Sequence, residues 1–220
     1  MRRRQWISAA VAFCAAAAFA AAQAPVSQGA GQGRGGGGQG AGAPGPGGAG
    51  GPARGITINA NPIQKAHADI SGNGITGTAD FVEYAQGNGQ IVQVIVNVTG
   101  LPPGMHGMHI HTVGKCDPPN FTTAGGHFDP GPFGNPDADL NHPYHSGDLP
   151  NINSAQGPNG LTASVTTYTT RFNLGGPLTL FDADGSSIII HANPDTYSTG
   201  TQGQGVAGGA RLACGVITKS

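Results

Sequence analysis

Hydrophobic and polar residues alternate along several stretches of this sequence, which is the pattern of strands that bury one face. From Val92 to Val98 every second residue is a valine, whereas Gln93 and Asn97 point to the other side of an extended chain. No stretch combines the 3.6-residue period of an amphipathic helix with capping residues at its ends. Segments rich in Val, Ile, Thr and aromatic residues recur at the spacing of β-hairpins, which predicts an all-β sandwich or barrel of seven or eight strands. The predicted strands are 66–70, 75–84, 91–98, 105–111, 161–172, 188–191 and 212–217.

The stretch from Thr112 to Pro158 interrupts this pattern, because it shows almost no strand signal. Loops of that length are uncommon inside a compact domain unless they carry function. The sequence therefore predicts that this segment holds the functional residues.

The N-terminal residues have the pattern of an export signal. Three arginines, Arg2 to Arg4, precede an alanine-rich apolar stretch over 6–20, and Ala20-Ala21-Ala22 offers small residues for cleavage. The apolar stretch is shorter than the roughly 20 residues that a membrane-spanning helix needs, so a membrane anchor is the weaker interpretation. Residues 1–22 are predicted to be a secretory signal peptide, which places the mature protein in the periplasm or outside the cell without a membrane span.

A Gly-, Ala-, Pro- and Gln-rich segment follows over 23–55. It contains 15 of the 40 glycines of the chain, and Arg34 and Arg54 are its only charged residues. Such a composition cannot bury enough apolar surface to offset the entropy of ordering. The segment is predicted to be a disordered tail, and 56–220 to be the folded domain.

The predicted domain is acidic, although the whole chain has a formal charge of −1. From Gly55 onward there are five Lys and Arg residues against all eleven Asp and Glu residues, and 5 − 11 gives −6. Proteins that bind nucleic acid need clustered Lys and Arg, so nucleic acid is excluded as a partner. The five basic residues are Lys65, Lys115, Arg171, Arg211 and Lys219.

Two cysteines, Cys116 and Cys214, remain once the predicted signal peptide with Cys14 is removed. An even pair in an oxidising compartment predicts one disulfide, which would close a loop of 98 residues. The alternative is metal ligation by the thiolates, which is disfavoured because the two cysteines are far apart in sequence and many histidines compete.

Six of the eight histidines fall between His106 and His145, and His191 follows at the end of the strand predicted over 188–191. His109 and His111 are two residues apart on a predicted strand, so both imidazoles leave the same face and can reach one ion. Histidine nitrogens from one strand face and from elsewhere suit copper, and histidine with a carboxylate suits tetrahedral zinc.

Five segments in this order resemble the copper/zinc superoxide dismutases. Gly107-Met108-His109-Ile110-His111 resembles the His-x-His strand of that family, and Gly209 to Val216 is similar to its C-terminal signature. The resemblance covers about 66–217. It implies a Greek-key fold of about eight antiparallel strands, with a long metal-binding loop and a second active-site loop. The segments that carry it are 107–111, 124–130, 145–149, 187–191 and 209–216.

The resemblance implies a copper ion and a zinc ion as cofactors. Carried over residue by residue, Arg211 matches the arginine that guides superoxide, and Asp195 matches the carboxylate that links copper and zinc histidines. Cys116 and Cys214 match the disulfide of the family. The implied copper ligands are His109, His111, His127 and His191, and His127, His145 and Asp148 match zinc ligands, with His127 bridging both ions as a catalytic group.

One position departs from the family pattern. A further zinc histidine is expected eight or nine residues after His127, where this chain has Asn135 and Pro136. Neither is a sensible zinc ligand. His142, three residues before His145, is predicted to take that place; the alternative is a loop histidine beside a weakened or empty zinc site.

The implied activity is dismutation of superoxide to oxygen and hydrogen peroxide. The alternative is a copper-binding or copper-delivery domain of the same fold without dismutase activity, which would not need Arg211 or Asp195. The oligomeric state is left open between a monomer and a homodimer. His106 is predicted to be structural, and the remaining loop acids are predicted to face solvent or cap turns: Asp129, Asp137 and Asp139.

Overall fold

The computed structural model describes residues 61–131 and 137–220, and the predicted signal peptide and tail lie outside these ranges. The described chain is almost entirely strands and loops, with one short 3-10 helix, η1 (Thr122–Ala124). None of its helices is long and apolar enough to cross a bilayer. The strands are β1 (Pro62–Gly72), β2 (Ile75–Gln86), β3 (Gly89–Thr99), β4 (Gly104–His111), β5 (Asp148–Gly157), β6 (Gly160–Thr169), β7 (Ser187–His191), β8 (Arg211–Val216) and β9 (Thr218–Lys219).

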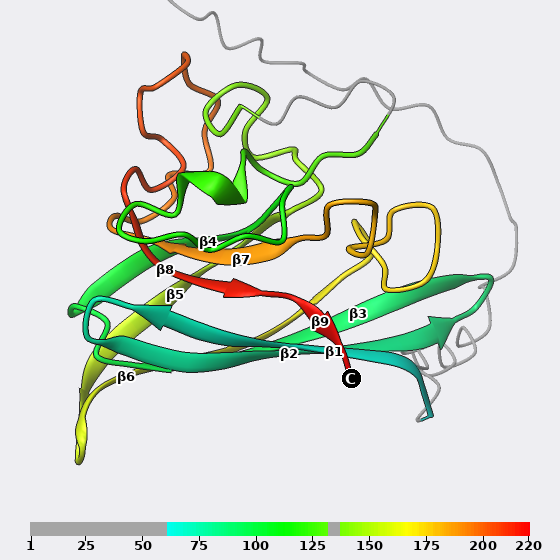
Figure 1. Ribbon diagram of the computed structural model, residues 1–220, viewed down its shortest axis with the longest axis horizontal. Coiled ribbons are helices and arrows are strands. Elements are labelled where there is room, and N and C mark those ends of the chain that lie inside the picture. The colour runs from blue at the N-terminus through cyan, green and yellow to red at the C-terminus, as the bar shows by residue number, and fades with distance from the viewer. Residues whose placement is uncertain (1–60, 132–136) are drawn as a thin grey trace, which may run out of the picture. The chain divides into compact units, whose positions relative to one another are not determined.

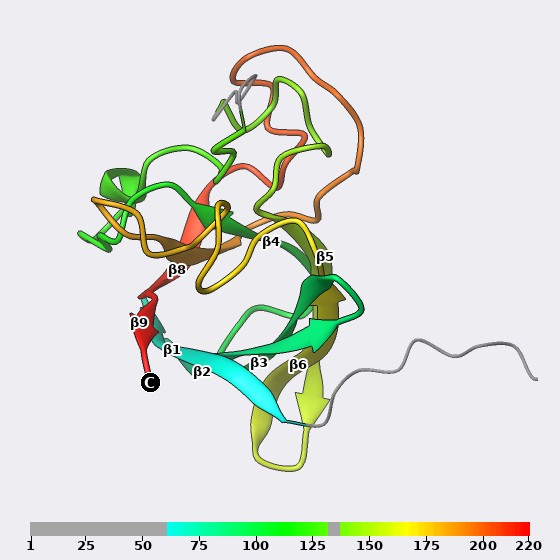
Figure 2. The ribbon, with the colours of Figure 1, turned by 90° about the vertical axis from the view of Figure 1, so that its right-hand side faces the viewer.

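The strands form a closed antiparallel barrel. Their order in the sheet is β2-β3-β6-β5-β4-β7-β8-β1-β9. Because β1 also pairs with β2, the strands from β2 to β1 in this order close a ring. Figures 1 and 2 show this barrel from two directions. Because β3 lies beside β6 and β4 beside β7, the chain crosses between non-consecutive strands as in a Greek key. The all-β prediction is confirmed.

Alternation along the strands fills the barrel. All four valines from Val92 to Val98 are buried, whereas Gln93 is half-buried and Asn97 is exposed. Phe81 and Phe172 meet edge to face inside the barrel, with ring centroids 6.5 Å apart, an arrangement that aromatic pairs favour.

The prediction of an uninterrupted loop up to Pro158 is wrong for β5. Its sequence has Pro150, two asparagines and few β-branched residues, so it lacks the usual composition of a strand. It forms because it pairs with β4 on one side and β6 on the other. The pairing with β4 shifts register between His106 and Met108, and this irregularity lies opposite Pro150, which has no N–H to donate.

The other strand predictions hold with shifted ends. The strand predicted over 161–172 ends at Thr169, and the strand predicted over 212–217 is β8. The short β9 follows β8 and lies beyond the predicted range.

Two long loops lie on the same outer side of the barrel. One connects β4 to β5, and the other connects β7 to β8. Both rise above β4 and β7 in Figure 1 and above β4 and β8 in Figure 2. The predicted histidine cluster sits where these loops meet the barrel.

Candidate metal centre

Four buried histidines from three parts of the chain converge on the outer side of the barrel that these loops cover. His109 and His111 come from β4, His191 from the end of β7, and His127 from the β4–β5 loop. The backbones of His127 and His111 pair in an isolated β-bridge. One potential ligand atom from each lies within 4.8 Å of the others. Each ring has a buried nitrogen without a hydrogen-bond partner: Nδ1 of His109, and Nε2 of His111, His127 and His191.

The opposite nitrogen of each ring has a partner, which fixes the tautomer. His111 Nδ1 donates to the carbonyl of Gly125 at 3.0 Å, and His191 Nδ1 donates to the carbonyl of Gly209 at 2.9 Å. His109 Nε2 donates to the Asp195 carboxylate at 2.8 Å. Buried imidazole nitrogens that are left unpaired while the rest of the ring is held in place are the arrangement of a metal site.

A second cluster surrounds the carboxylate of Asp148, the first residue of β5. His127 Nδ1 lies 2.7 Å from Asp148 Oδ1, and His145 Nδ1 lies 3.1 Å from Oδ2. His142 Nδ1 is 3.3 Å from the same Oδ2. Three histidine Nδ1 atoms therefore face one carboxylate, and His127 belongs to both clusters.

The second set of closely spaced ligand atoms contains His109, His127, His142 and Asp148, with His109 where the sequence predicted His145. Since His109 Nε2 donates to Asp195, its unpartnered Nδ1 belongs with the first cluster. His145 remains tied to the second cluster through Asp148.

Asp195 joins the two clusters. Its Oδ2 accepts from His109 Nε2, and its Oδ1 accepts from His142 Nε2 at 2.6 Å. The bond to His142 leaves Nδ1 of that ring facing Asp148. Asp195 thus bonds to one histidine of each cluster.

Asn151 on β5 holds Asp195 from behind. Its side-chain amide donates to the Asp195 carbonyl at 2.9 Å and accepts from the Asp195 N–H at 2.8 Å. The Asn151 N–H also donates to the Tyr197 hydroxyl at 2.6 Å. Sequence analysis missed Asn151, since nothing in its local sequence signals a contact 44 residues away.

The pKa values of the histidines differ between the two clusters. Burial and neighbouring histidines hold the pKa of His111 and His191 well below 6.5, and they lower the pKa of His127 to about 4. The rings of the first cluster are therefore neutral at neutral pH, which is the form that binds metal.

The second cluster behaves in the opposite way. Burial opposes the charge on His142, but hydrogen bonds to Asp148 and Asp195 raise its pKa to about 9. The pKa of Asp148 lies far below its usual value, against the effect of burial, because three histidines bond to it. A metal ion among these groups would meet three imidazole nitrogens and a carboxylate oxygen, a donor set that suits tetrahedral zinc.

The donor atoms of the first cluster are all imidazole nitrogens. Four such nitrogens suit copper, which accepts imidazole in tetragonal arrangements. The two clusters therefore fit two different ions, and His127 offers one nitrogen to each.

Arg211 lies beside the first cluster. Its guanidinium donates to the carbonyls of Phe121 and Gly125 at 2.7 and 2.6 Å, and its positive charge contributes to the low pKa of both His111 and His191. Gly125 thus accepts from both His111 and Arg211.

The predicted disulfide is confirmed. Cys116 and Cys214 are joined, with Cα atoms 5.6 Å apart. The bond connects the start of the β4–β5 loop to β8. A small buried cluster of Phe121, Ala124, Ile189 and Cys214 packs beside it.

His106 supports the site from outside. Its ring nitrogens lie 2.8 Å from the carbonyls of Pro102 and His191, so it links the loop before β4 to the end of β7, in agreement with a structural role.

The prediction that Asp139 faces solvent or caps a turn is wrong. Asp139 is 4% exposed, and its carboxylate accepts from the N–H groups of Gly205 and Ala207. The partners lie more than 60 residues away in the other loop, so local sequence could not reveal them.

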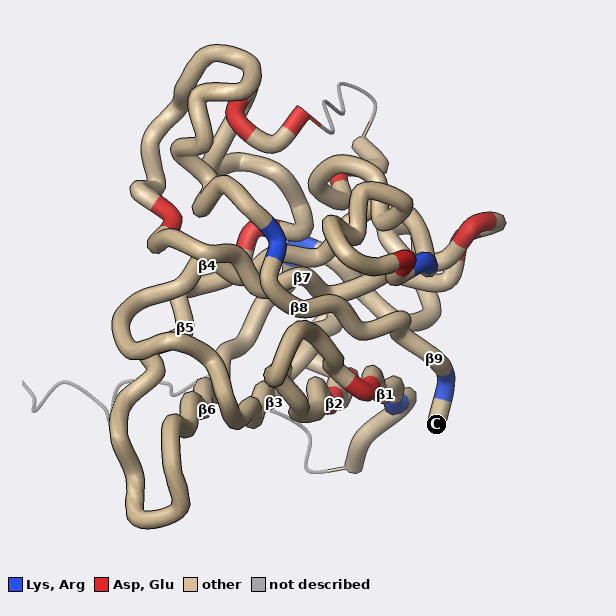
Figure 3. The backbone as a smooth tube through the Cα atoms, turned by 60° about the vertical axis from the view of Figure 1, so that its left-hand side comes forward, with Lys and Arg blue, Asp and Glu red and all other residues tan. Residues whose placement is uncertain are grey.

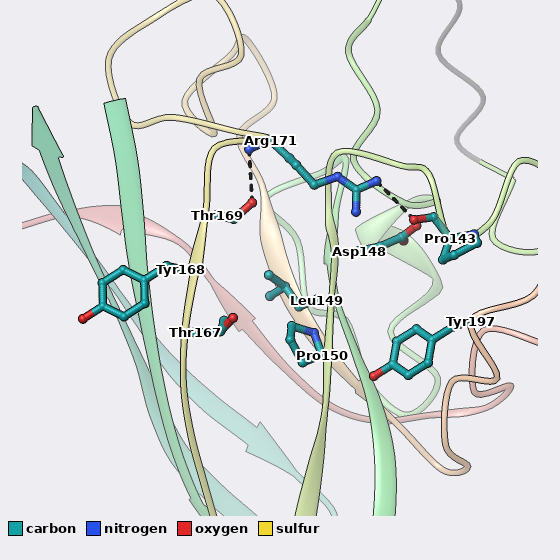
Figure 4. Close-up of a pocket in the computed structure, with 9 residues that line it drawn as sticks. All are labelled: Pro143, Asp148, Leu149, Pro150, Thr167, Tyr168, Thr169, Arg171 and Tyr197. Atoms are coloured by element: carbon teal, nitrogen blue, oxygen red, sulfur yellow. Dashed lines mark hydrogen bonds between the residues drawn. The ribbon is translucent and has the colours of Figure 1, made fainter. Parts of the chain in front are cut away.

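Two cavities border these clusters. One of about 210 Å³ is lined by His191, by Asp139 and by glycines of the β7–β8 loop. The other, of about 350 Å³, lies behind Asp148 and is shown in Figure 4. There Arg171 donates to the carbonyl of Pro143 at 3.1 Å and so braces the segment between His142 and His145.

Comparison with known proteins gives a consistent result. The family model of copper/zinc superoxide dismutase matches residues 75–217. Superoxide dismutase [Cu-Zn] 2 of Aquifex aeolicus is 35% identical over 157 residues, which are 70% of this chain and 86% of that protein. Superoxide dismutase [Cu-Zn] of Caulobacter vibrioides is 41% identical over 128 residues, which are 56% and 68% of the two chains.

Two further matches extend this picture. Extracellular superoxide dismutase [Cu-Zn] of Onchocerca volvulus is 36% identical over 170 residues, which are 73% of this chain and 78% of that protein. The crystal structure of the clock protein EA4 superposes with a TM-score of 0.55 and 29% identity, and the match covers 71% of this chain and 94% of that one.

Proposed function

The chain belongs to the copper/zinc superoxide dismutase family, and we propose how its own residues divide the work of that reaction. Dismutation converts two superoxide anions and two protons to oxygen and hydrogen peroxide. A bound copper ion would supply the redox chemistry, the oxidation of one superoxide and the reduction of a second, and the histidine shared with the zinc site would help to hold both ions. The protein supplies the ligand geometry, a guide for the anion and a site for a proton.

The copper site is assigned to His109, His111, His127 and His191. The observation that supports it best is the convergence of four buried, unpartnered imidazole nitrogens. Each ring is already held through its other nitrogen, so binding requires little reorganisation. Because the rings are neutral at neutral pH, no proton has to leave before the metal enters.

The zinc site is assigned to His127, His142, His145 and Asp148. The contact between His142 and Asp195 supports His142 as the displaced zinc histidine, because the same carboxylate also holds His109. Asn135 and Pro136, which occupy the usual position, lie outside the described residues.

His127 belongs to both sites, and its ring is assigned as the site that holds a proton. Its Nδ1 faces Asp148, while its Nε2 is the unpartnered atom in the copper cluster. Nε2 can therefore hold a proton whenever it is not a ligand, while the ring stays anchored through Nδ1.

Arg211 is assigned as the guide for superoxide, since it is a fixed positive charge beside the copper cluster. In Arg211→Ala, we expect the rate constant for superoxide decay by the copper-loaded protein to fall by roughly tenfold, because a fixed, half-buried positive charge would stabilise the docked anion at short range, where salt screens little. Pulse-radiolysis decay measures it. Lys115→Ala removes the same charge from an exposed position and should change the rate little.

The same assay separates a dismutase from a copper-delivery domain of this fold. Catalytic decay that depends on Arg211 supports the dismutase. Copper-loaded protein that binds the metal but leaves superoxide decay at its uncatalysed rate would contradict the proposed function.

The ionic-strength dependence of the rate should be modest. The β7–β8 loop has no Lys, Arg, Asp or Glu over 196–210, and Figure 3 shows this part of the chain without charged residues. Between about 10 mM and 150 mM salt, where the Debye length falls from about 30 to 8 Å, we expect the rate constant to change by less than about twofold. A steep loss with salt would show that residues other than Arg211 build a strong positive funnel.

Export is proposed for the mature protein, to the periplasm or the exterior. The disulfide and the similarity to an extracellular relative are consistent with an oxidising compartment. In this proposal 1–22 is the signal peptide, 23–55 a tail and 56–220 the enzyme domain. Mass spectrometry of the mature N-terminus tests the predicted cleavage after Ala22.

A further inference from the structure

Asp139 is a buried carboxylate between the two loops of the metal centre. It lies in the β4–β5 loop, three residues before His142, yet its oxygens do not face the metal ligands. Oδ2 accepts from the Gly205 N–H at 2.8 Å, and Oδ1 lies 3.4 Å from the Ala207 N–H. Its main-chain carbonyl also accepts from the Gly200 N–H at 3.0 Å. One residue therefore contacts the β7–β8 loop at three points.

The loop that it holds is rich in glycine. It is otherwise fixed by backbone hydrogen bonds and by Thr199, whose hydroxyl donates to the His142 carbonyl at 2.6 Å. Residues 196–210 contain five glycines, and no charged side chain that could form an ion pair. Gly203, Gly205, Gly208 and Gly209 all have positive φ, between 67° and 96°. Glycine pays the largest entropic cost on ordering, so this segment needs anchors from outside.

The anchored loop reaches the copper cluster through its own backbone. The Gly208 N–H donates to the Gly205 carbonyl at 3.2 Å, and Gly208 in turn accepts from the Asn193 N–H at 3.0 Å. A Cβ on Gly208 would lie 2.7 Å from the Cβ of His191, so the loop backbone packs directly on this histidine.

The next glycine of the loop sets the tautomer of the same histidine. The Gly209 carbonyl accepts from His191 Nδ1 at 2.9 Å, which leaves Nε2 for the metal. Asp139 and His191 also line the same cavity of about 210 Å³. The position of the loop thus determines both the hydrogen bond to His191 and the shape of the opening beside it.

We propose that Asp139 is a positioning residue for the copper site. Its carboxylate fixes the glycine-rich loop over 200–209, and this loop holds His191 in its metal-binding tautomer and keeps the cavity beside it open. The inference rests on the proposed copper site. It assigns a residue of the zinc-binding loop a role in copper geometry that is independent of zinc ligation.

The test compares Asp139→Ala and Asp139→Asn with the wild type, each as the full chain loaded with copper and zinc. Hydrogen exchange with mass spectrometry reads the amides of 200–209, and Cu(II) electron paramagnetic resonance reads the copper environment. In Asp139→Ala we expect exchange at Gly205 and Ala207 to be about tenfold faster, since each loses its hydrogen bond. We also expect a changed copper hyperfine splitting, with zinc content unchanged.

Asp139→Asn keeps the proposal testable if the Asp139→Ala variant does not fold. The amide keeps the size of the side chain and one oxygen for the Gly205 N–H, so exchange should quicken at Ala207 more than at Gly205. Asp184→Ala is the matched control, because it removes the same charge from an exposed position and should leave both readouts as in the wild type.

Two outcomes would overturn the proposal. One is wild-type exchange over 200–209 and a wild-type copper spectrum in both Asp139 variants. The other is a loss of zinc parallel to the copper change, which would mean that Asp139 acts by shaping the zinc ligands. Exchange and spectra do not depend on turnover, so a failure of the proposed dismutase activity would be seen separately, in the decay assay on the wild type.

Discussion

Replacing both cysteines of the disulfide, as Cys116→Ser with Cys214→Ser, is expected to lower the free energy of unfolding by about 4 to 5 kcal/mol. The bond spans 98 residues of sequence, and in the chain-entropy model a cross-link over so long a loop strongly restricts the unfolded chain. Urea unfolding of the metal-free protein, oxidised and with both substitutions, measures the difference.

The same variant should lose activity even where it stays folded. The disulfide holds the loop that carries Phe121 and Gly125, and both carbonyls position Arg211. Gly125 also accepts from His111. Movement of this loop would therefore displace the guide for superoxide and release one copper histidine from its hydrogen bond.

Wild-type protein under reducing conditions is the control for this prediction. It keeps both sulfur atoms and loses only the covalent bond, so its unfolding midpoint should match that of the double variant. A difference below about 1 kcal/mol between oxidised and reduced protein would contradict a major role for the disulfide in stability.

The alternation of hydrophobic and polar residues was enough to predict strands in which every second residue is buried. The valines of 91–98 show this, because their burial depends on the period of a strand and not on its partner. The missed strand β5 shows the limit. Its residues form a strand because β4 and β6 lie on either side with free backbone groups, and that arrangement is a property of the closed barrel.

The candidate site also contains residues that could be predicted from the sequence and residues that could not. The gathering of histidines could be predicted, that of His109 and His111 from their spacing on a strand and that of the others from the resemblance to the family. Two residues that hold the surroundings of the ligands could not be predicted: the Asn151 side chain bonds to the backbone of Asp195, and the Asp139 carboxylate accepts from the N–H groups of Gly205 and Ala207. Each side chain bonds to main-chain groups far away in sequence. Almost every residue has the same main-chain groups, so the sequence does not indicate which of them such a side chain will contact.

His142→Ala is expected to weaken zinc binding by at least about 100-fold while copper stays bound, because removing a contact that merely supports a metal ligand already costs 10 to 100-fold. In the structure His142 Nδ1 faces Asp148, and no other histidine side chain among the described residues bonds to both Asp148 and Asp195. Elemental analysis after dialysis against a weak chelator measures both metals, and competition with a chromophoric chelator gives the zinc affinity.

The substitution also removes a partner from Asp195, and that effect must be separated from the loss of a ligand. His142→Gln serves this purpose, because an amide can still donate to Asp195 Oδ1 but is a poor zinc ligand. If His142 is a ligand, both variants lose zinc, and the Gln variant keeps copper more completely than the Ala variant. His67→Ala, at a surface histidine paired with Asp80, should retain both metals. Full zinc occupancy in His142→Ala would show that the ion is held without this ring, and the zinc site would then have to be assigned to His127, His145 and Asp148 with another donor.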